Sequence, residues 1–134
     1  MPATLLTVSL PDSIVGVLLS LQDIVPMNDL AGKKLGLLLS TPPSHPNADV
    51  VAGLSREALR SHVNVYLYLI DEGVKNLENP AILGLTSAGV KLSVCAYGCQ
   101  QHKVSTEGYG QEVTFCGLVV LSQIITGCDR FISL

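Results

Sequence analysis

The stretch GVKLSVCAYGCQQHKV, Gly89–Val104, carries the clearest structural signal in the chain. Its apolar Val90, Leu92 and Val94 alternate with polar residues, which is the pattern of a β-strand. Cys95 comes where this strand ends. A cysteine at the carboxyl end of a parallel strand lies at the edge where open α/β sheets bind ligands. Cys95 is therefore the first candidate for a catalytic residue.

Two interpretations of Cys95 are open. If the chain enters a helix directly after the strand, the free N–H groups of the first helical turn would favour a thiolate over a thiol. Cys95 would then be a nucleophile. Most free cysteines are instead buried and pack as small apolar side chains. The position at a strand end does not by itself decide between the two.

Three residues that follow Cys95 are candidates for an auxiliary or site-lining role: Tyr97, Cys99 and His102. On a helix, Cys99 and His102 would share the face of Cys95. An imidazolium at His102 would stabilise a thiolate, although a solvated surface histidine fits the sequence equally well. Cys99 is either a packed thiol or a partner for oxidised sulfur on Cys95. A disulfide between helical positions i and i+4 has poor geometry, which favours the packed thiol.

The composition limits the class of protein. A chain of 134 residues has the usual size of one domain, so residues 1–134 are expected to form a single domain. Hydrophobic residues make up 48% of the chain and charged residues only 14%. Such a monomer would leave apolar surface uncovered, so we expect a homo-oligomer. The net charge of −3 argues against nucleic-acid binding.

Metal and nucleotide patterns are missing from the sequence. The spacing of the four cysteines fits no zinc site, and the chain holds neither a GxGxxG nor a phosphate-loop pattern. We therefore expect no metal and no cofactor. Without a secretory leader, a cytoplasmic location with free thiols is the expectation.

The order of the elements predicts the fold class. Strand and helix patterns alternate, which predicts a three-layer α/β/α fold with a mostly parallel, about five-stranded sheet. Near-continuous apolar runs are typical of strands that are covered on both faces. The expected strands are a short one at Thr4–Leu10, two apolar runs at Lys34–Ser40 and Val63–Ile70, then Val90–Cys95 and Arg130–Leu134. The expected helices are Ile14–Val25, one that begins near Asn47 or Asp49, one from Pro80 to near Gly89, and Val113–Thr126.

Two of these helices are apolar on nearly every side. Ile14–Val25 belongs to an N-terminal extension, residues 1–32, and is too short and too interrupted by polar residues to span a bilayer. Val113–Thr126 has the same character. Helices of this kind are buried in a core or between subunits. We expect one or both at the subunit contact.

The order of the strands decides what lies beside Cys95. In a half-Rossmann order, the Lys34–Ser40 strand lies between the Val63–Ile70 strand and the strand that ends at Cys95. The proline-rich loop after Lys34–Ser40 would then share a crevice with Cys95. This order predicts that Ser44 and His45, which lie in that loop, line the site.

Three segments together resemble the DsrE/DsrF-like family of sulfur-relay proteins. They are KLGLLLS (Lys34–Ser40), VNVYLYLIDEGV (Val63–Val74) and GVKLSVC (Gly89–Cys95), and the resemblance covers about Lys34 to Leu134. In that family a strand-end cysteine accepts a sulfane sulfur as a persulfide and hands it to a partner protein. The matching position here is Cys95. The resemblance also implies donor and acceptor proteins, and a trimer or larger homo-oligomer.

The sequence departs from the family after Cys95. Members typically carry an Arg-Arg-Gly or Arg-Gly element six to eight residues beyond the cysteine, where this chain has Gln101-His102-Lys103. Three functions are therefore weighed. The first is a sulfur-relay protein, sulfurtransferase-like, with its persulfide on Cys95. The second is a non-catalytic structural or binding subunit of the same fold. The third is a thiol-based redox protein that uses Cys95 and Cys99.

Overall fold

The computed structural model describes residues 29–134. The expected strand Thr4–Leu10 and helix Ile14–Val25 lie outside the described residues. Within them, no helix is both long enough and apolar enough to cross a membrane.

A five-stranded sheet organises the described part of the chain, and each of its pairings is parallel. This confirms the α/β class and the predicted sheet of about five strands, four of which lie where the sequence predicted them. The strands are β1 (Lys34–Leu39), β2 (Asn64–Leu69), β3 (Lys91–Cys95), β4 (Val113–Cys116) and β5 (Arg130–Ser133), in the order β4-β3-β2-β1-β5.

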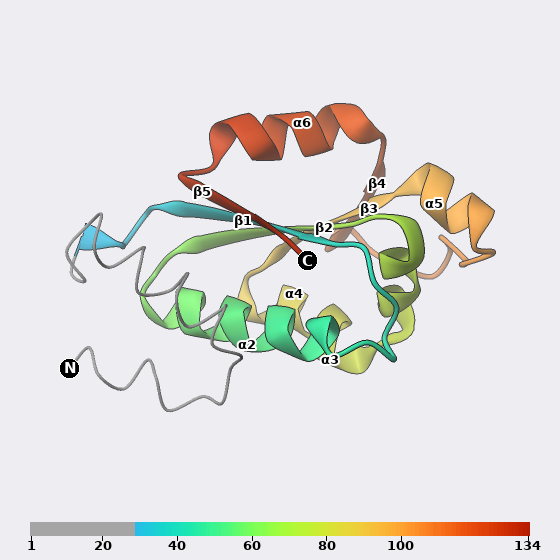
Figure 1. Cartoon of the computed structure of the whole chain (residues 1–134), viewed down its shortest axis with the longest axis horizontal. Helices are drawn as coiled ribbons and strands as arrows, with labels where there is room; N and C mark the ends of the chain where they lie inside the picture. The colour runs from blue at the N-terminus through green and yellow to red at the C-terminus, as the bar shows by residue number, and fades with distance from the viewer. Residues whose placement is uncertain (1–28) are drawn as a thin grey trace.

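Helices cover both faces of this sheet (Figure 1). One face carries α2 (Asn47–Arg60), the 3₁₀ segment η3 (Asp71–Glu78), α3 (Pro80–Leu83) and α4 (Leu85–Ala88). The other face carries α6 (Leu118–Gly127), which packs over β1 and β5. The short helix α5 (Ala96–Gln101) follows β3 directly. The three layers agree with the predicted architecture.

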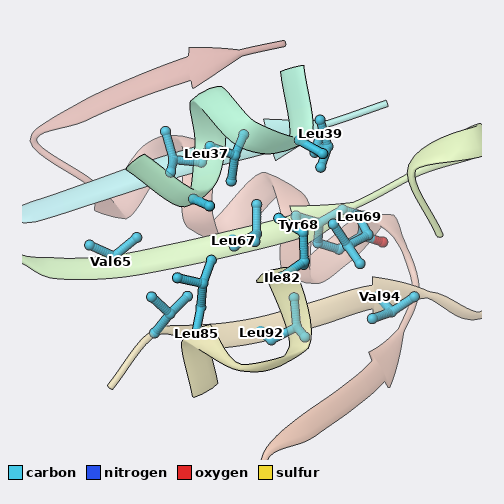
Figure 2. Packing of buried hydrophobic residues seen from close by; sticks show 14 of the residues in the cluster. Leu37, Leu39, Val65, Leu67, Tyr68, Leu69, Ile82, Leu85, Leu92 and Val94 are labelled. Atoms are coloured by element: carbon cyan, nitrogen blue, oxygen red, sulfur yellow. The ribbon is translucent and has the colours of Figure 1, made fainter. Parts of the chain in front are cut away.

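The core lies between the sheet and α2 because alternate strand residues point to that side. Leu37, Leu67 and Leu92 have at most 2% of their surface exposed and occupy neighbouring strands (Figure 2). Val51 and Leu54 of α2 are fully buried against them. Burying a leucine or valine side chain stabilises a fold by about 1.5–3 kcal/mol, so these buried side chains hold the sheet against α2.

The backbone after β2 lies unusually close to the end of β1. Gly73, in η3, leaves no room for a side chain, because a Cβ there would overlap the carbonyl oxygen of Leu39. The buried Asn76 fixes the same contact, since its Nδ2 donates to the Thr41 carbonyl oxygen at 2.9 Å. This close approach holds η3 over the carboxyl ends of the strands, beside Cys95.

The prediction of a helix at Val113–Thr126 is wrong for the first residues of that segment. Val113–Cys116 is the edge strand β4, and the helix begins only at Leu118. Gly117 separates them with an extended backbone, φ −98° and ψ −170°. The β-branched and aromatic residues of VTFC favour a strand, and pairing with β3 supplies their hydrogen bonds. Likewise, the helix expected from Pro80 is divided at Gly84 into α3 and α4.

The half-Rossmann strand order is also wrong. β2 lies between β1 and β3, so the loop after β1 does not adjoin the end of β3. The chain moves outward in one direction from β1 to β4 and returns through α6, which places β5 on the other side of β1. The crevice that was predicted between the loop after β1 and the end of β3 is therefore not formed.

The outer side of α6 is apolar and uncovered in the described chain. Leu118, Val119 and Ile125 have 60%, 72% and 46% of their surface exposed. Only Ile124 of this helix is buried. These three side chains leave apolar surface of α6 in contact with solvent within residues 29–134.

Replacing Gly73 with alanine should destabilise the fold by about 3 kcal/mol, because the new Cβ must displace the backbone at Leu39. Urea unfolding measures the free-energy change. The control is Gly127→Ala, whose Cβ meets no atom within 4 Å. It should change stability by at most about 1 kcal/mol. Equal effects of the two substitutions would contradict the close contact.

Candidate functional site

Cys95 is the last residue of β3 and the N-cap of α5. Its Sγ accepts a hydrogen bond from the backbone N–H of Gly98 at 3.3 Å. The helix required by the thiolate interpretation is therefore present. A backbone donor aimed at sulfur stabilises the charged form of a thiol. The side chain is 5% exposed, so it is sheltered as well.

A pocket of about 520 Å³ opens beside this sulfur. Its walls come from three neighbouring strand ends and from α5. The strand ends contribute Ile70, Asp71, Cys95, Gly117 and Leu118, and α5 and its C-cap contribute Tyr97, Gly98, Gln101 and His102. Cys95 is the nucleophilic side chain of this wall.

His102 and Tyr97 lie where the sequence places them, on the pocket that Cys95 lines. His102 is the C-cap of α5 and half-buried. Tyr97 is 67% exposed, and its hydroxyl accepts a 2.8 Å hydrogen bond from Gln101 Nε2. Together they give the pocket a polar rim opposite the strand ends.

Asp71 joins the pocket through an unusual backbone conformation. It follows β2 closely and has a φ of +53°, in the left-handed region that few residues other than glycine adopt. This turn lets the chain reverse over the end of β3, where the Asp71 backbone nitrogen comes close to Gly98. Aspartate is one of the residues that adopt this conformation most readily after glycine.

Ser44 and His45 do not lie in this pocket. Both are exposed in the loop after β1, and β2 separates that loop from β3. His45 has a local role instead, because its Nδ1 accepts the backbone N–H of Asn47 at 3.1 Å, at the start of α2. The prediction that they share a crevice with Cys95 fails because it rested on the wrong strand order.

Cys99 is buried to 1% exposure on α5. Burial raises the pKa of its thiol, and a negative charge on Cys95 raises it further. Cys99 therefore favours the protonated thiol. This agrees with the packed-thiol interpretation.

Two residues near the sulfur were not predicted as site residues. Cys116 is the register partner of Cys95 on β4, and Tyr68 of β2 lies next to both. The Tyr68 hydroxyl donates to the carbonyl oxygen of Gly117 at 3.1 Å. Burial raises the pKa of Tyr68 strongly, and charge on Cys95 or Cys116 raises it further. The phenol therefore stays protonated beside the sulfurs.

The sequence held only a weak signal for these two. Tyr68 lies in the apolar run predicted as the strand Val63–Ile70, and it is fully buried. Cys116 falls within the helix expected at Val113–Thr126, whereas it ends a strand and is half-buried. Within residues 29–134, no group of three or more His, Cys, Asp or Glu is placed to hold a metal ion.

Comparison with known proteins identifies the architecture. The sequence matches no protein-family model and no curated protein. Solved structures do match. The ychN protein from E. coli superposes with a TM-score of 0.61 at 17% identity, covering 77% of this chain and 99% of the other. BT1422 from Bacteroides thetaiotaomicron, a conserved protein of unknown function, gives 0.64 at 15% identity, covering 76% and 95%.

The chain has the DsrE/DsrF-like fold. Its five parallel strands and the helices on their two faces match these structures over most of their length. At identities below one fifth, the match describes the DsrE/DsrF-like fold alone, and the chemistry at Cys95 has to be argued from the site.

Replacing His102 with alanine should slow alkylation of Cys95 near neutral pH by about threefold, because the pocket loses an imidazole that attracts the thiolate whenever it carries a proton. The rate is measured with iodoacetamide and peptide mapping on folded protein. His45→Ala is the matched control, since His45 lies outside the pocket. An unchanged rate for His102→Ala would assign His102 to the solvated surface.

Proposed function

We propose that this protein is a sulfur-relay protein that carries a persulfide on Cys95 and passes the sulfur to a partner protein. The observation that supports this most directly is the hydrogen bond from the Gly98 N–H to Cys95 Sγ, at the wall of an open pocket. The DsrE/DsrF-like fold adds weight, because the strand-end cysteine of that family occupies the matching position.

The transfer needs only thiol chemistry. The Cys95 thiolate attacks the outer sulfur of a donor protein's persulfide, and the donor's thiolate leaves with the electron pair of the broken S–S bond. The sulfur is then bound to Cys95. An acceptor thiolate attacks this outer sulfur, and Cys95 leaves as a thiolate. No metal or organic cofactor takes part.

The reaction needs space for a second sulfur beside Cys95 and stabilisation of Cys95 when it leaves as a thiolate, and the pocket supports both. Its volume of about 520 Å³ gives an outer sulfur and an incoming thiol room beside Cys95. The N–H of Gly98 stabilises Cys95 each time it leaves as a thiolate. The proposal places the protein in a reducing cytoplasm, where its four free cysteines keep their thiols.

One observation favours a second function, a non-catalytic subunit of the same fold. Cys95 is only 5% exposed, so its side chain has little contact with solvent. In that case the cysteine packs between β3 and α5, and the protein acts through its surface. The third function, redox chemistry between Cys95 and Cys99, is disfavoured because Cys99 is only 1% exposed and a disulfide between helical positions i and i+4 has poor geometry.

A sulfane donor should add the mass of one sulfur atom to the folded wild-type protein, and Cys95→Ser should abolish the addition. Intact-mass spectrometry followed by peptide mapping measures the loading. Cys99→Ser and Cys128→Ser are the matched controls and should load normally, because neither residue lines the pocket. If no wild-type protein loads from several donors, the non-catalytic subunit is correct. If Cys95→Ser loads and Cys99→Ser does not, the carrier is Cys99.

We also propose that the chain assembles into a homo-oligomer, a trimer or larger, through the outer side of α6. Leu118, Val119 and Ile125 would be buried at this contact, which removes their apolar surface from water.

Light scattering at micromolar concentration should therefore report a mass of at least three chains for the wild type. Val119→Lys should lower that mass, because a charge would be buried at the contact. Gln111→Lys, an exposed change outside α6, should leave it unaltered. A monodisperse wild-type monomer would contradict the assembly.

A further inference from the structure

The cysteine placed beside Cys95 by the sheet is Cys116. The two residues are register partners at the carboxyl ends of β3 and β4. Partners on adjacent parallel strands point to the same face of the sheet, with backbones about 4.8 Å apart. A disulfide requires Cα atoms roughly 4.4–6.8 Å apart, so the pair lies within bonding reach.

Tyr68 of β2 lies close to both sulfurs. Burial raises the pKa of its hydroxyl strongly, and charge on Cys95 or Cys116 raises it further. One hydroxyl group on β2 therefore neighbours both sulfurs. Burial raises the pKa of the Cys116 thiol, and charge on Cys95 raises it further.

The surroundings of Cys116 leave room for its thiol to react with sulfur bound to Cys95. Cys116 is half-buried. The next residue, Gly117, lines the pocket and has open space where a Cβ would be. A group leaving from Cys95 can therefore depart through the pocket while Cys116 approaches from the strand side. Cys99, in contrast, lies on α5 and is almost completely buried.

We propose that Cys95 and Cys116 form a cross-strand dithiol in which Cys116 is the resolving thiol for sulfur bound to Cys95. The substrates are low-molecular-weight disulfides and persulfides. The persulfide case rests on the proposed relay function, whereas the disulfide case does not.

The reaction balances in two steps. The Cys95 thiolate attacks a disulfide RS–SR, forms a Cys95–S–SR bond and releases one RS⁻. Cys116 then loses its proton to solvent and attacks Cys95 Sγ, and the second RS⁻ leaves with the electron pair. Two cysteine thiols are oxidised to one disulfide, and RS–SR is reduced to two thiols. With a persulfide on Cys95, the leaving group is hydrosulfide, HS⁻.

This pair gives the relay a second outcome. When no acceptor protein removes the outer sulfur, Cys116 attacks Cys95 and releases that sulfur as hydrosulfide. An internal disulfide between Cys95 and Cys116 remains. A cellular thiol then restores both cysteines by exchange. The chain would thereby avoid holding a persulfide indefinitely.

The test uses one equivalent of 4,4′-dithiodipyridine per chain of the full-length protein. Wild type should release two thiopyridone molecules per molecule of reagent and gain a Cys95–Cys116 disulfide, seen by non-reducing peptide mapping. Cys116→Ser and Cys116→Ala should release one and keep a thiopyridyl adduct on Cys95. The adduct should disappear at least about tenfold faster in wild type than in these variants. Cys128→Ser is the matched control and should behave as wild type.

Two results would overturn the inference. A stable adduct on wild-type Cys95, or a disulfide mapped to Cys95 and Cys99, would remove Cys116 as the resolving thiol and leave the relay function standing. Absence of any reaction at Cys95 would overturn the dithiol and the relay together. The wild-type mapping does not depend on any variant folding correctly.

Discussion

The parallel pairing of β3 with β2 on one side and β4 on the other is the constraint on which the site depends. It places Tyr68 beside Ser93 and Cys95 beside Cys116, with these side chains on one face. Buried leucines on the opposite face, such as Leu67, fix the register. A slip of one residue would turn every side chain of a strand to the wrong face, so the hydrophobic core also holds the sulfurs in place.

Much of the fold follows from local sequence. The apolar runs that became β1 and β2, and the alternation before Cys95, were enough to predict buried parallel strands. The four-residue strand Val113–Cys116 was not predicted, because the apolar helix after it has a similar composition and Gly117 was the only break. Strand order was also beyond local reasoning, since it depends on which apolar faces pack together across the whole sheet.

The candidate site was predictable to the same extent. Cys95, Tyr97 and His102 needed only the end of one strand and the helix after it, and all three line the pocket. Placing His45 beside Cys95 required the strand order, and that prediction failed with it. Cys116 became visible only once β4 was paired with β3. Contacts within a segment could be predicted, whereas contacts between strands required the structure.

Selective alkylation of the four cysteines at about pH 6 tests the central claim most directly, namely that Cys95 is the reactive thiol. Burial raises the pKa of Cys99, Cys116 and Cys128, so these three hold little thiolate at that pH. The Gly98 N–H stabilises a thiolate at Cys95. With limiting iodoacetamide on the folded protein, peptide mapping should find Cys95 labelled first, and the preference should vanish in urea. Labelling of Cys128 or Cys116 ahead of Cys95 would contradict the account.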